Sequence, residues 1–202
     1  ILAQSAVFSS IIWKKGVNTE KINKIVLCSL ASKYVHSALA PWCLFSALKE
    51  KHADVDATVV ESTVNNDIDN IIDKIVEGNF KIVSFTCYIW NIDKTIEICK
   101  KVKEKTGATI ILGGPEVSYR AKNVLDDYPF IDFVLSGEGE ETYPELINAL
   151  INNKSYEDID GLTYRDNNEI ITNPEKEYTD TPANPYCEEF FKNLNNRISY
   201  IE

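Results

Sequence analysis

Two adjacent glycines, Gly113 and Gly114, follow the apolar run 108–112 and are themselves followed by Pro115 and Glu116. Because glycine has no side chain, the backbone at this point is open to close approach by a flat or bulky ligand. Ligands of parallel sheets bind where the strands end and the loops begin. The segment therefore predicts a binding position for a large cofactor.

Hydroxyl and aromatic side chains mark the end of another apolar run, residues 81–86. The hydroxyls of Ser84 and Thr86 can bond to the amides or the phosphate of a ligand, and hydrogen bonding within the strand is the structural alternative. Tyr88 and Trp90 come next, and an aromatic ring there can cover one face of a flat ligand or pack in the core. We expect this loop to contribute to the same binding position.

A third candidate segment, residues 136–139 with the sequence Ser-Gly-Glu-Gly, precedes a helical pattern. Its glycines leave backbone N–H groups open to a carbonyl-rich or anionic ligand edge. Glu138, Glu140 and Glu141 would repel a free phosphate, so they suit the amide N–H groups of a ligand or the N-terminus of the helix. Both alternatives remain open from the sequence.

The composition excludes several classes of function. The formal net charge is −10 at pH 7, whereas nucleic acids and anionic membranes attract basic faces. The five cysteines are odd in number and form no Cys-x-x-Cys pair, which disfavours a disulfide framework or a zinc site. Of these cysteines, only Cys87 lies in a loop that faces the expected ligand. We expect a reducing cytoplasm, and neither nucleic acid nor membrane as a partner.

From residue 24 onward, short apolar runs alternate with amphipathic stretches. Gly78 and Gly107 follow two of these stretches, where left-handed helix caps are expected. Five strands alternating with helices predict an α/β fold with a flavodoxin-like (Rossmann-like), doubly wound, five-stranded parallel sheet. The predicted strands cover residues 24–30, 57–61, 81–86, 109–112 and 133–135, and the predicted helices cover residues 37–51, 67–77, 92–105, 121–127 and 140–151.

The pattern changes after residue 152. Residues 161–165 and 169–172 flank an Asp-Asn-Asn turn and predict a β-hairpin. Several prolines mark the extended linker that follows, with a short helix near residues 188–194. At the other end, residues 1–13 are apolar but too short to span a bilayer. We expect residues 1–23 to be a leader whose role the sequence leaves open.

Known ligands of such sheets can be tested against the loops. A dinucleotide fold would carry Gly-x-Gly-x-x-Gly after the first strand, but residues 29–34 contain no glycine. A phosphoacceptor domain needs an Asp at the end of the third strand, and residues 84–87 contain none. An FMN loop would be rich in Ser, Thr and Gly, and the first loop offers two serines. A flavodoxin-like FMN domain for electron transfer therefore stays open.

Three short motifs are similar, in order, to those of cobalamin-binding domains with this topology. Such domains bear Asp-x-His-x-x-Gly after the first strand, Ser-x-Leu or Ser-x-Thr at the third, and Gly-Gly after the fourth. At these places the sequence has Tyr34-Val35-His36-Ser37-Ala38-Leu39, Ser84-Phe85-Thr86 and Gly113-Gly114. The resemblance implies a corrinoid as the ligand.

The first motif departs from this pattern at two positions. Tyr34 stands in place of the Asp, and Leu39 stands in place of the Gly. Without the carboxylate that would orient its ring, His36 is a less firmly placed cobalt ligand, and the alternative is that it caps the following helix or lines the pocket. Tyr88 or Trp90 would then cover the lower side of cobalt instead of coordinating it.

Longer phrases carry a closer resemblance. Together they cover roughly residues 24–180 and resemble the amino-terminal cobalamin-binding domain of cobalamin-dependent radical S-adenosylmethionine proteins. The phrases are residues 33–37, 84–91, 112–118, 136–142 and 161–165.

That family continues into a barrel whose Cys-x-x-x-Cys-x-x-Cys motif binds a 4Fe-4S cluster and cleaves S-adenosylmethionine. Residues 196–202 resemble the strand that runs into this motif, and the barrel itself is not in the chain. The resemblance therefore implies a partner barrel in the same polypeptide, with cobalamin relaying a methyl group or assisting radical chemistry. By itself the chain is expected to bind cobalamin and to catalyse nothing.

The resemblance also implies a division of the chain and a set of cofactor-binding residues. Residues 1–23 would be the leader, 24–152 the cobalamin-binding domain, and 153–202 the hairpin and linker. The alternatives are the FMN domain and an interaction module whose crevice holds no ligand. The implied cofactor-binding residues are Ser29, Tyr34, His36, Ser37, Ser84, Thr86, Tyr88, Trp90, Gly113, Gly114, Pro115, Glu116, Ser136, Gly137, Glu138 and Gly139, with His36 as the candidate cobalt ligand.

Overall fold

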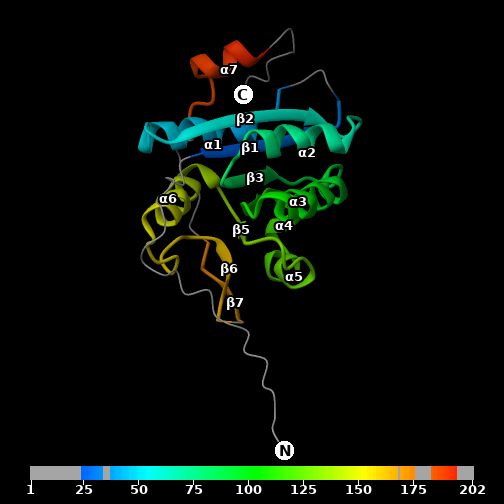
Figure 1. Cartoon of the computed structure of the whole chain (residues 1–202). Coiled ribbons are helices and arrows are strands. Elements are labelled where there is room, and N and C mark those ends of the chain that lie inside the picture. Colours follow the sequence, from blue (N-terminus) through cyan, green and yellow to red (C-terminus); the bar gives the residue numbers. More distant parts are fainter. Residues whose placement is uncertain (1–23, 34–36, 168, 176–182, 195–202) are drawn as a thin grey trace, which may run out of the picture.

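The computed structural model describes residues 24–33, 37–167, 169–175 and 183–194. In these ranges the chain forms a sheet with helices on both faces (Figure 1). Tyr34, His36 and the leader 1–23 lie outside the described residues. None of the helices in the described ranges has the length and apolar character needed to cross a membrane.

Five parallel strands alternate with helices along the chain, which confirms the predicted doubly wound α/β fold. The central strands are apolar on both faces because helices cover both, and every residue of β3 is buried. The parallel strands are β1 (Lys24–Ala31), β2 (Asp56–Thr63), β3 (Ile82–Thr86), β4 (Thr109–Gly113) and β5 (Phe133–Leu135), and the helices are α1 (Leu39–Lys51), α2 (Ile68–Glu77), α3 (Ile92–Thr106), α4 (Pro115–Ser118), α5 (Ala121–Asp127), α6 (Gly139–Asn152) and α7 (Glu188–Asn193).

The predicted hairpin consists of β6 (Leu162–Asp166) and β7 (Glu169–Thr172), and it extends the main sheet. Because β6 pairs antiparallel with β5, the sheet has seven strands in the order β2-β1-β3-β4-β5-β6-β7, where the sequence predicted five. The hairpin turn can be predicted locally, but no local signal says which strand edge the hairpin joins. Arg165 of β6 ties it to the neighbouring helix, since its guanidinium donates to the carbonyl oxygens of Leu125 and Ile131.

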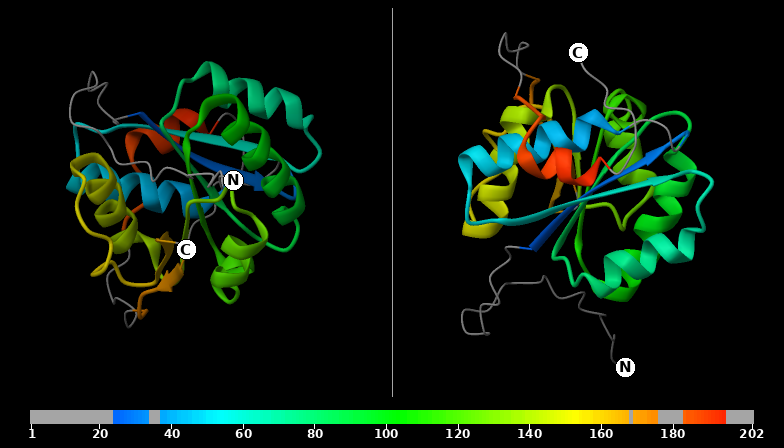
Figure 2. Two further views of the ribbon diagram at one scale, coloured as in Figure 1. Left: turned by 60° about the horizontal axis from the view of Figure 1, so that its bottom comes forward. Right: turned by 90° about the horizontal axis from the view of Figure 1, so that it is seen from above.

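Side chains of each strand alternate between the two faces of the sheet. Val83 and Phe85 of β3 join the core beneath α2, α3, α4 and α5, whereas Ile82 packs on the opposite face beneath α1, α6 and α7. Figure 2 shows these two groups of helices on either side of the sheet. By the same alternation, Ser84 and Thr86 lie on the face that α1 and α6 cover.

Helix α1 is held in place by residues from other elements. Its N-cap residue, Ala38, has no capping side chain, and Glu61 of β2 supplies one instead. The Glu61 carboxylate accepts hydrogen bonds from Ala38 N at 2.6 Å and from Trp42 Nε1 at 3.2 Å. On its other side the Trp42 ring meets Phe190 of α7 edge to face, with 5.6 Å between ring centroids. These contacts fix α1 relative to the sheet.

Two local predictions differ in outcome. Gly107 adopts the predicted left-handed conformation after α3, with φ of 67°. The same prediction was wrong for Gly78, whose φ is −63°, because Asn79 takes the left-handed conformation instead. A Cβ atom at Gly78 would lie 2.0 Å from the ring of Phe80, so close packing requires this glycine.

The single-turn helix α4 was not predicted, because four residues are too few to show a period.

Candidate functional site

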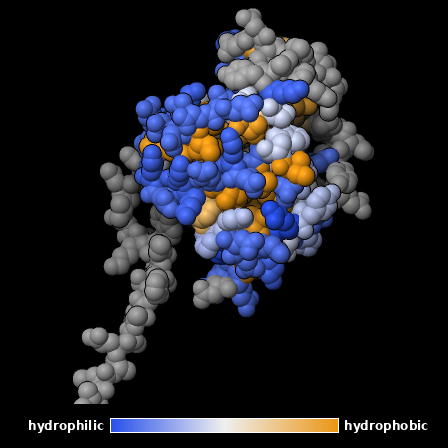
Figure 3. Space-filling view, turned by 90° about the vertical axis from the view of Figure 1, so that its right-hand side faces the viewer, coloured by the Kyte–Doolittle hydropathy of each residue, from blue (hydrophilic) through white to orange (hydrophobic). Residues whose placement is uncertain are grey.

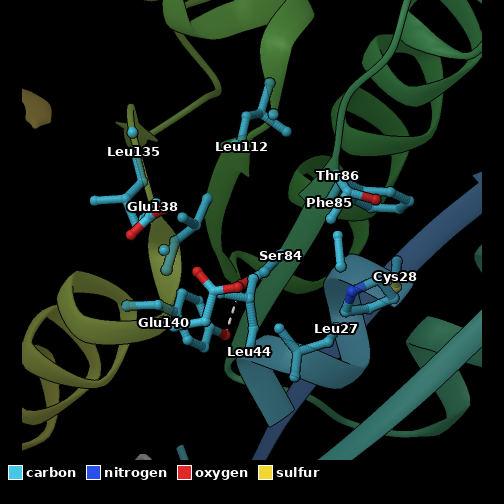
Figure 4. A pocket seen from close by; sticks show the side chains of 18 of the residues that line it. Leu27, Cys28, Leu44, Ser84, Phe85, Thr86, Leu112, Leu135, Glu138 and Glu140 are labelled. Atoms are coloured by element: carbon cyan, nitrogen blue, oxygen red, sulfur yellow. Dashed lines mark hydrogen bonds between the residues drawn. The ribbon is translucent and has the colours of Figure 1, made fainter. Parts of the chain in front are cut away.

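A cavity of about 280 Å³ lies between the sheet and helices α1 and α6, at the carboxyl ends of β3 and β4. Leu27, Leu44, Ile111 and Leu135 give it apolar walls, and Figure 4 shows side chains from several elements around it. Figure 3 looks onto the side toward which the strands point in Figure 1, and apolar residues gather there among polar ones. This position and lining are typical of cofactor sites in parallel sheets.

Three small residues lie side by side across the sheet at the level of this cavity. In the strand register Ser29 is opposite Thr86, and Thr86 is opposite Gly113. Thr86 Oγ1 donates to Ser29 Oγ at 3.1 Å. Gly113 lines the cavity, and a Cβ atom there would make only one close contact, 3.4 Å from the carbonyl oxygen of Leu135. The fold itself would therefore accept a side chain at Gly113, which would project toward the cavity.

Gly114 is a glycine for a different reason. Its φ is 99°, a conformation that other residues rarely adopt. A Cβ atom at Gly114 would lie 2.6 Å from the carbonyl oxygen of Cys87, so the backbone that follows β3 occupies this space. That backbone is fixed to the β4 end, since Cys87 N donates to Gly113 O at 2.7 Å. Gly113 thus faces the cavity, whereas Gly114 must be a glycine because of the packing of the chain itself.

Ser84 and Tyr143 place a hydrogen-bonded hydroxyl pair on the cavity wall. Ser84 Oγ and Tyr143 Oη are 2.9 Å apart, and Figure 4 marks this bond with a dashed line. Burial raises the pKa of the Tyr143 hydroxyl, and the bond to Ser84 opposes that rise only in part. Tyr143 therefore stays a neutral hydroxyl at physiological pH, able to donate and to accept.

The loop from β3 to α3 carries two stacked aromatic rings. The rings of Tyr88 and Trp90 are 4.6 Å apart and 3° from parallel. Trp90 is 49% exposed, so it is not a core residue. Buried Asn91 holds the loop: its Nδ2 donates to Leu30 O and Thr86 O, both at 3.1 Å, and its Oδ1 accepts from Tyr88 N at 2.8 Å. The loop is thereby fixed to the carboxyl ends of β1 and β3.

Cys87 does not face the ligand side, contrary to the prediction. It is fully buried in the core on the α3 side of the sheet, together with Cys28 and Cys99. Burial raises the pKa of the Cys87 thiol well above its ordinary value, and the Glu116 carboxylate adds to the shift. A thiolate from Cys87 is therefore excluded as a cobalt ligand.

The segment before α6 reaches the cavity through its backbone and its acids. Gly137, Glu138 and Gly139 line the cavity, and Glu138 is the N-cap residue but makes no capping hydrogen bond through its side chain. A Cβ atom at Gly139 would lie 2.7 Å from Leu44 Cδ2, so this glycine lets α6 approach α1 closely. Glu140 lies in the first helical turn, where the helix dipole favours an acid, and also lines the cavity.

The family model described as "B12 binding domain" matches residues 27–147, which is more than half of the chain. The match includes β3, β4, β5 and α1 and most of β1 and α6, which are the elements around the cavity. The chain belongs to the B12-binding domain family.

Curated and solved relatives of this B12-binding domain are larger proteins. The chain is 30% identical over 125 residues to the cobalamin-dependent radical SAM methyltransferase TokK of Streptomyces tokunonensis. The aligned region covers 59% of the chain and 18% of TokK. The chain shares its fold with OxsB, a cobalamin-dependent S-adenosylmethionine radical enzyme solved with aqua-cobalamin and S-adenosylmethionine bound (TM-score 0.65, 18% identity, 76% of the chain and 22% of OxsB).

A third relative is the radical S-adenosylmethionine methyltransferase TsrM of Kitasatospora setae, solved with cobalamin and a [4Fe-4S] cluster bound. It matches with a TM-score of 0.60 and 20% identity, over 81% of the chain and 32% of TsrM. The chain thus spans less than a third of the length of each of these relatives. None of these comparisons supports the FMN alternative.

The residues around the cavity fit a flat, mostly apolar part of a corrinoid. The apolar walls, the side-chain-free face at Gly113 and the Ser84–Tyr143 pair suit a flat group with few polar atoms. In the ranges that the structure describes, no three His, Cys, Asp or Glu side chains are grouped so that they could hold a metal ion. His36 lies outside these ranges, so its role as a cobalt ligand stays a prediction.

The structure brings half of the predicted site residues to the cavity, and of the others Tyr34 and His36 lie outside the described residues. Ser29 lies beside the cavity behind Thr86, and Ser136 Oγ donates to Ser118 O at 3.3 Å. Ser37 is buried, and its hydroxyl has no hydrogen-bond partner among the residues that the structure describes. Pro115 and Glu116 begin α4, outside the lining. The predicted residues that line the cavity are Ser84, Thr86, Tyr88, Gly113, Gly114, Gly137, Glu138 and Gly139.

Sequence reasoning missed the contribution of two helices. Ala40, Pro41 and Leu44 of α1 and Tyr143 of α6 line the cavity. The apolar residues of α1 leave no clear polar face, so its side toward the ligand could not be assigned. Tyr143 was not among the predicted site residues, because its contact with Ser84 joins two elements that are 59 positions apart in the sequence.

Proposed function

We propose that this chain holds cobalamin for a larger radical S-adenosylmethionine enzyme, with the nucleotide tail of the cofactor in the cavity between the sheet and α1. The observation that carries the proposal is the cavity at Gly113, because the fold leaves this space open and apolar although it would accept a side chain there. Bound cobalamin would supply methyl-transfer or radical chemistry that protein side chains do not have.

In this proposal the residues of the domain bind and orient. Gly113 and Gly114 form the wall along which the tail packs, and Ser84 and Thr86 offer hydroxyls to it. Glu138 and Glu140 accept hydrogen bonds from corrin amide N–H groups at the opening. The stacked rings of Tyr88 and Trp90 cover the lower side of the macrocycle and exclude water there.

For the remainder of the polypeptide we propose a barrel with a 4Fe-4S cluster and an S-adenosylmethionine site. Support comes from the greater length of TokK, OxsB and TsrM and from the groups bound in the latter two. We further propose the division into a leader (1–23), the cobalamin-binding domain (24–152) and a hairpin with linker (153–202), and a cytoplasmic location. The reaction would be a methyl transfer or a related radical reaction.

Reconstitution tests the proposal. The full-length protein that contains this chain, prepared without cofactor, should retain hydroxocobalamin after gel filtration in about equimolar amount, shown by the corrinoid absorption bands. The same preparation incubated with FMN should retain none. Retention of FMN without cobalamin would establish the flavin alternative, and retention of neither would favour the interaction module.

Replacing Trp90 tests the aromatic loop. Trp90→Ala removes half of the stacked pair, and we expect cobalamin affinity to fall about tenfold because a buried aromatic contact is lost on binding. Stability should change little, since Trp90 is half exposed. Phe191→Ala is the matched control, because Phe191 is 58% exposed but lies on α7, away from this loop. Equal dissociation constants for the Trp90 variant and wild type would remove the loop from the site.

A further inference from the structure

The loop that follows β5 reaches the cavity, and a later segment of the chain is bonded to it. Gly137, Glu138 and Gly139 of this loop line the cavity. The loop begins at Ser136, whose backbone N donates to Gly161 O at 2.9 Å. Gly161 immediately precedes β6, so the loop is joined to the hairpin before α6 begins.

Gly161 approaches this loop more closely than a residue with a side chain could. Its φ is 65°, and a Cβ atom there would lie 2.3 Å from Ser136 O and 3.2 Å from Ser136 C. Both are backbone atoms, so a side chain at Gly161 would have to displace the loop. At Gly107, where φ is a similar 67°, a Cβ atom would meet nothing within 4 Å. Backbone conformation alone therefore accounts for Gly107, whereas Gly161 must also be a glycine because of its contact with the loop.

The chain that follows β7 fixes Gly161 from its other side. Gly161 N donates to Pro174 O at 2.8 Å. The neighbouring Asn173 is buried, and its Nδ2 donates to Tyr156 O at 2.7 Å and to Ile159 O at 2.8 Å. Gly161 is therefore tied to the far end of the hairpin, which gives the loop after β5 a fixed support.

We propose that Gly161 is a positioning residue for the cofactor site: through Ser136 it sets where residues 137–139 lie, and so the shape of that wall of the cavity. This role rests on the proposed function, because it concerns the cavity in which the cofactor is proposed to bind. The match to the family model ends at residue 147, so it does not include this support. The hairpin thus acts on cofactor binding although it lies after the matched residues.

Replacing Gly161 with asparagine separates the contact from the backbone strain. Asparagine adopts a positive φ more readily than most residues with a side chain, and Asn153 does so in this chain with φ of 52°. Gly161→Asn therefore keeps the local conformation but places a Cβ atom against Ser136. We expect the loop to shift and the dissociation constant for hydroxocobalamin, measured by dialysis of the full-length apoprotein, to rise about tenfold.

Gly107→Asn is the matched control. It introduces the same side chain at a similar φ, without the close contact, and before β4 rather than at the carboxyl ends of the strands. Its dissociation constant should stay within about twofold of wild type. A loss of stability alone does not change the dissociation constant of a protein that remains folded, so this measurement distinguishes positioning of the site from general support of the fold.

Hydrogen exchange of the wild-type full-length protein tests the same coupling without a substitution. If the hairpin supports the loop, a local opening that releases Gly161 from Pro174 also deforms the cavity, so bound cobalamin must suppress that opening. Peptides from residues 159–175 should therefore exchange at least about tenfold more slowly with saturating hydroxocobalamin. Peptides from residues 101–107 are the control, because fraying of this end of α3 leaves the cavity intact, and their exchange should change less than about twofold.

The outcomes separate this role from the proposed function. A folded Gly161→Asn protein with wild-type affinity would overturn the role of Gly161, and its binding of cobalamin would still uphold the proposed function. Equal losses of affinity in the Gly161 and Gly107 variants would overturn it as well. If Gly161→Asn does not fold, exchange decides: slower exchange of residues 159–175 supports the role, and unchanged exchange overturns it. A wild-type protein that binds no cobalamin would overturn the proposed function and this role together.

Discussion

Gly113→Leu should abolish cobalamin binding while the domain remains folded. Gly113 lies on the face of β4 that lines the cavity, so a leucine side chain there would fill the space proposed for the tail. We expect the dissociation constant to rise by at least about 100-fold, because the ligand would have to displace well-packed atoms. The measurement is dialysis of the full-length apoprotein against hydroxocobalamin.

The stability of the same variant is the control. The contact of a new Cβ with Leu135 O, at 3.4 Å, has an ordinary length, and leucine is tolerated in a buried strand. Urea unfolding should therefore give a free energy within about 1 kcal/mol of wild type. Cobalamin binding with undiminished affinity by a folded Gly113→Leu protein would place the tail elsewhere.

Gly114→Ala, at the neighbouring position, should have the opposite effect, because it should lower the stability of the fold. Alanine at φ of 99° is strained, and its Cβ would lie 2.6 Å from Cys87 O and 2.9 Å from Cys87 N. These are backbone atoms that cannot rotate away. We expect the free energy of unfolding to fall by about 3 kcal/mol, measured by urea titration.

Gly107→Ala is the matched control for this variant. Gly107 is also left-handed, with φ of 67°, but a Cβ atom there would meet nothing within 4 Å. Its replacement should cost only the conformational strain, about 1 kcal/mol. The difference between the two variants then measures the clash with Cys87. Equal losses at both positions would show that the close approach of the β3 and β4 ends contributes nothing.

Much of the fold could be predicted because the signals are local. The limits of β5 and α5 were predicted to the residue, since apolar runs and turn residues define them. The αL cap at Gly107 was predicted for the same reason. The prediction of a left-handed cap at Gly78 was wrong, because the local pattern cannot show that the ring of Phe80 occupies the space where a side chain would lie.

The site was predictable where it depends on strand ends and unpredictable where it depends on contacts across the fold. Ser84, Thr86 and Gly113 follow directly from their strands, and all three line the cavity. Tyr143 meets Ser84 across 59 positions of sequence, which only the packing of α6 on the sheet reveals. Cys87 was misassigned because the strand ends at Thr86, so the side that the next residue faces could not be read from alternation.

The environment of Trp42 has a consequence for how quickly a ligand can enter. Its indole nitrogen is bonded to Glu61, and its ring is flanked by Phe45 and Phe190. Contacts within the chain itself thus hold α1 in place as a wall of the cavity. A preorganised receptor gives up little conformational entropy on association, so affinity depends on complementarity and uptake on diffusion to the opening.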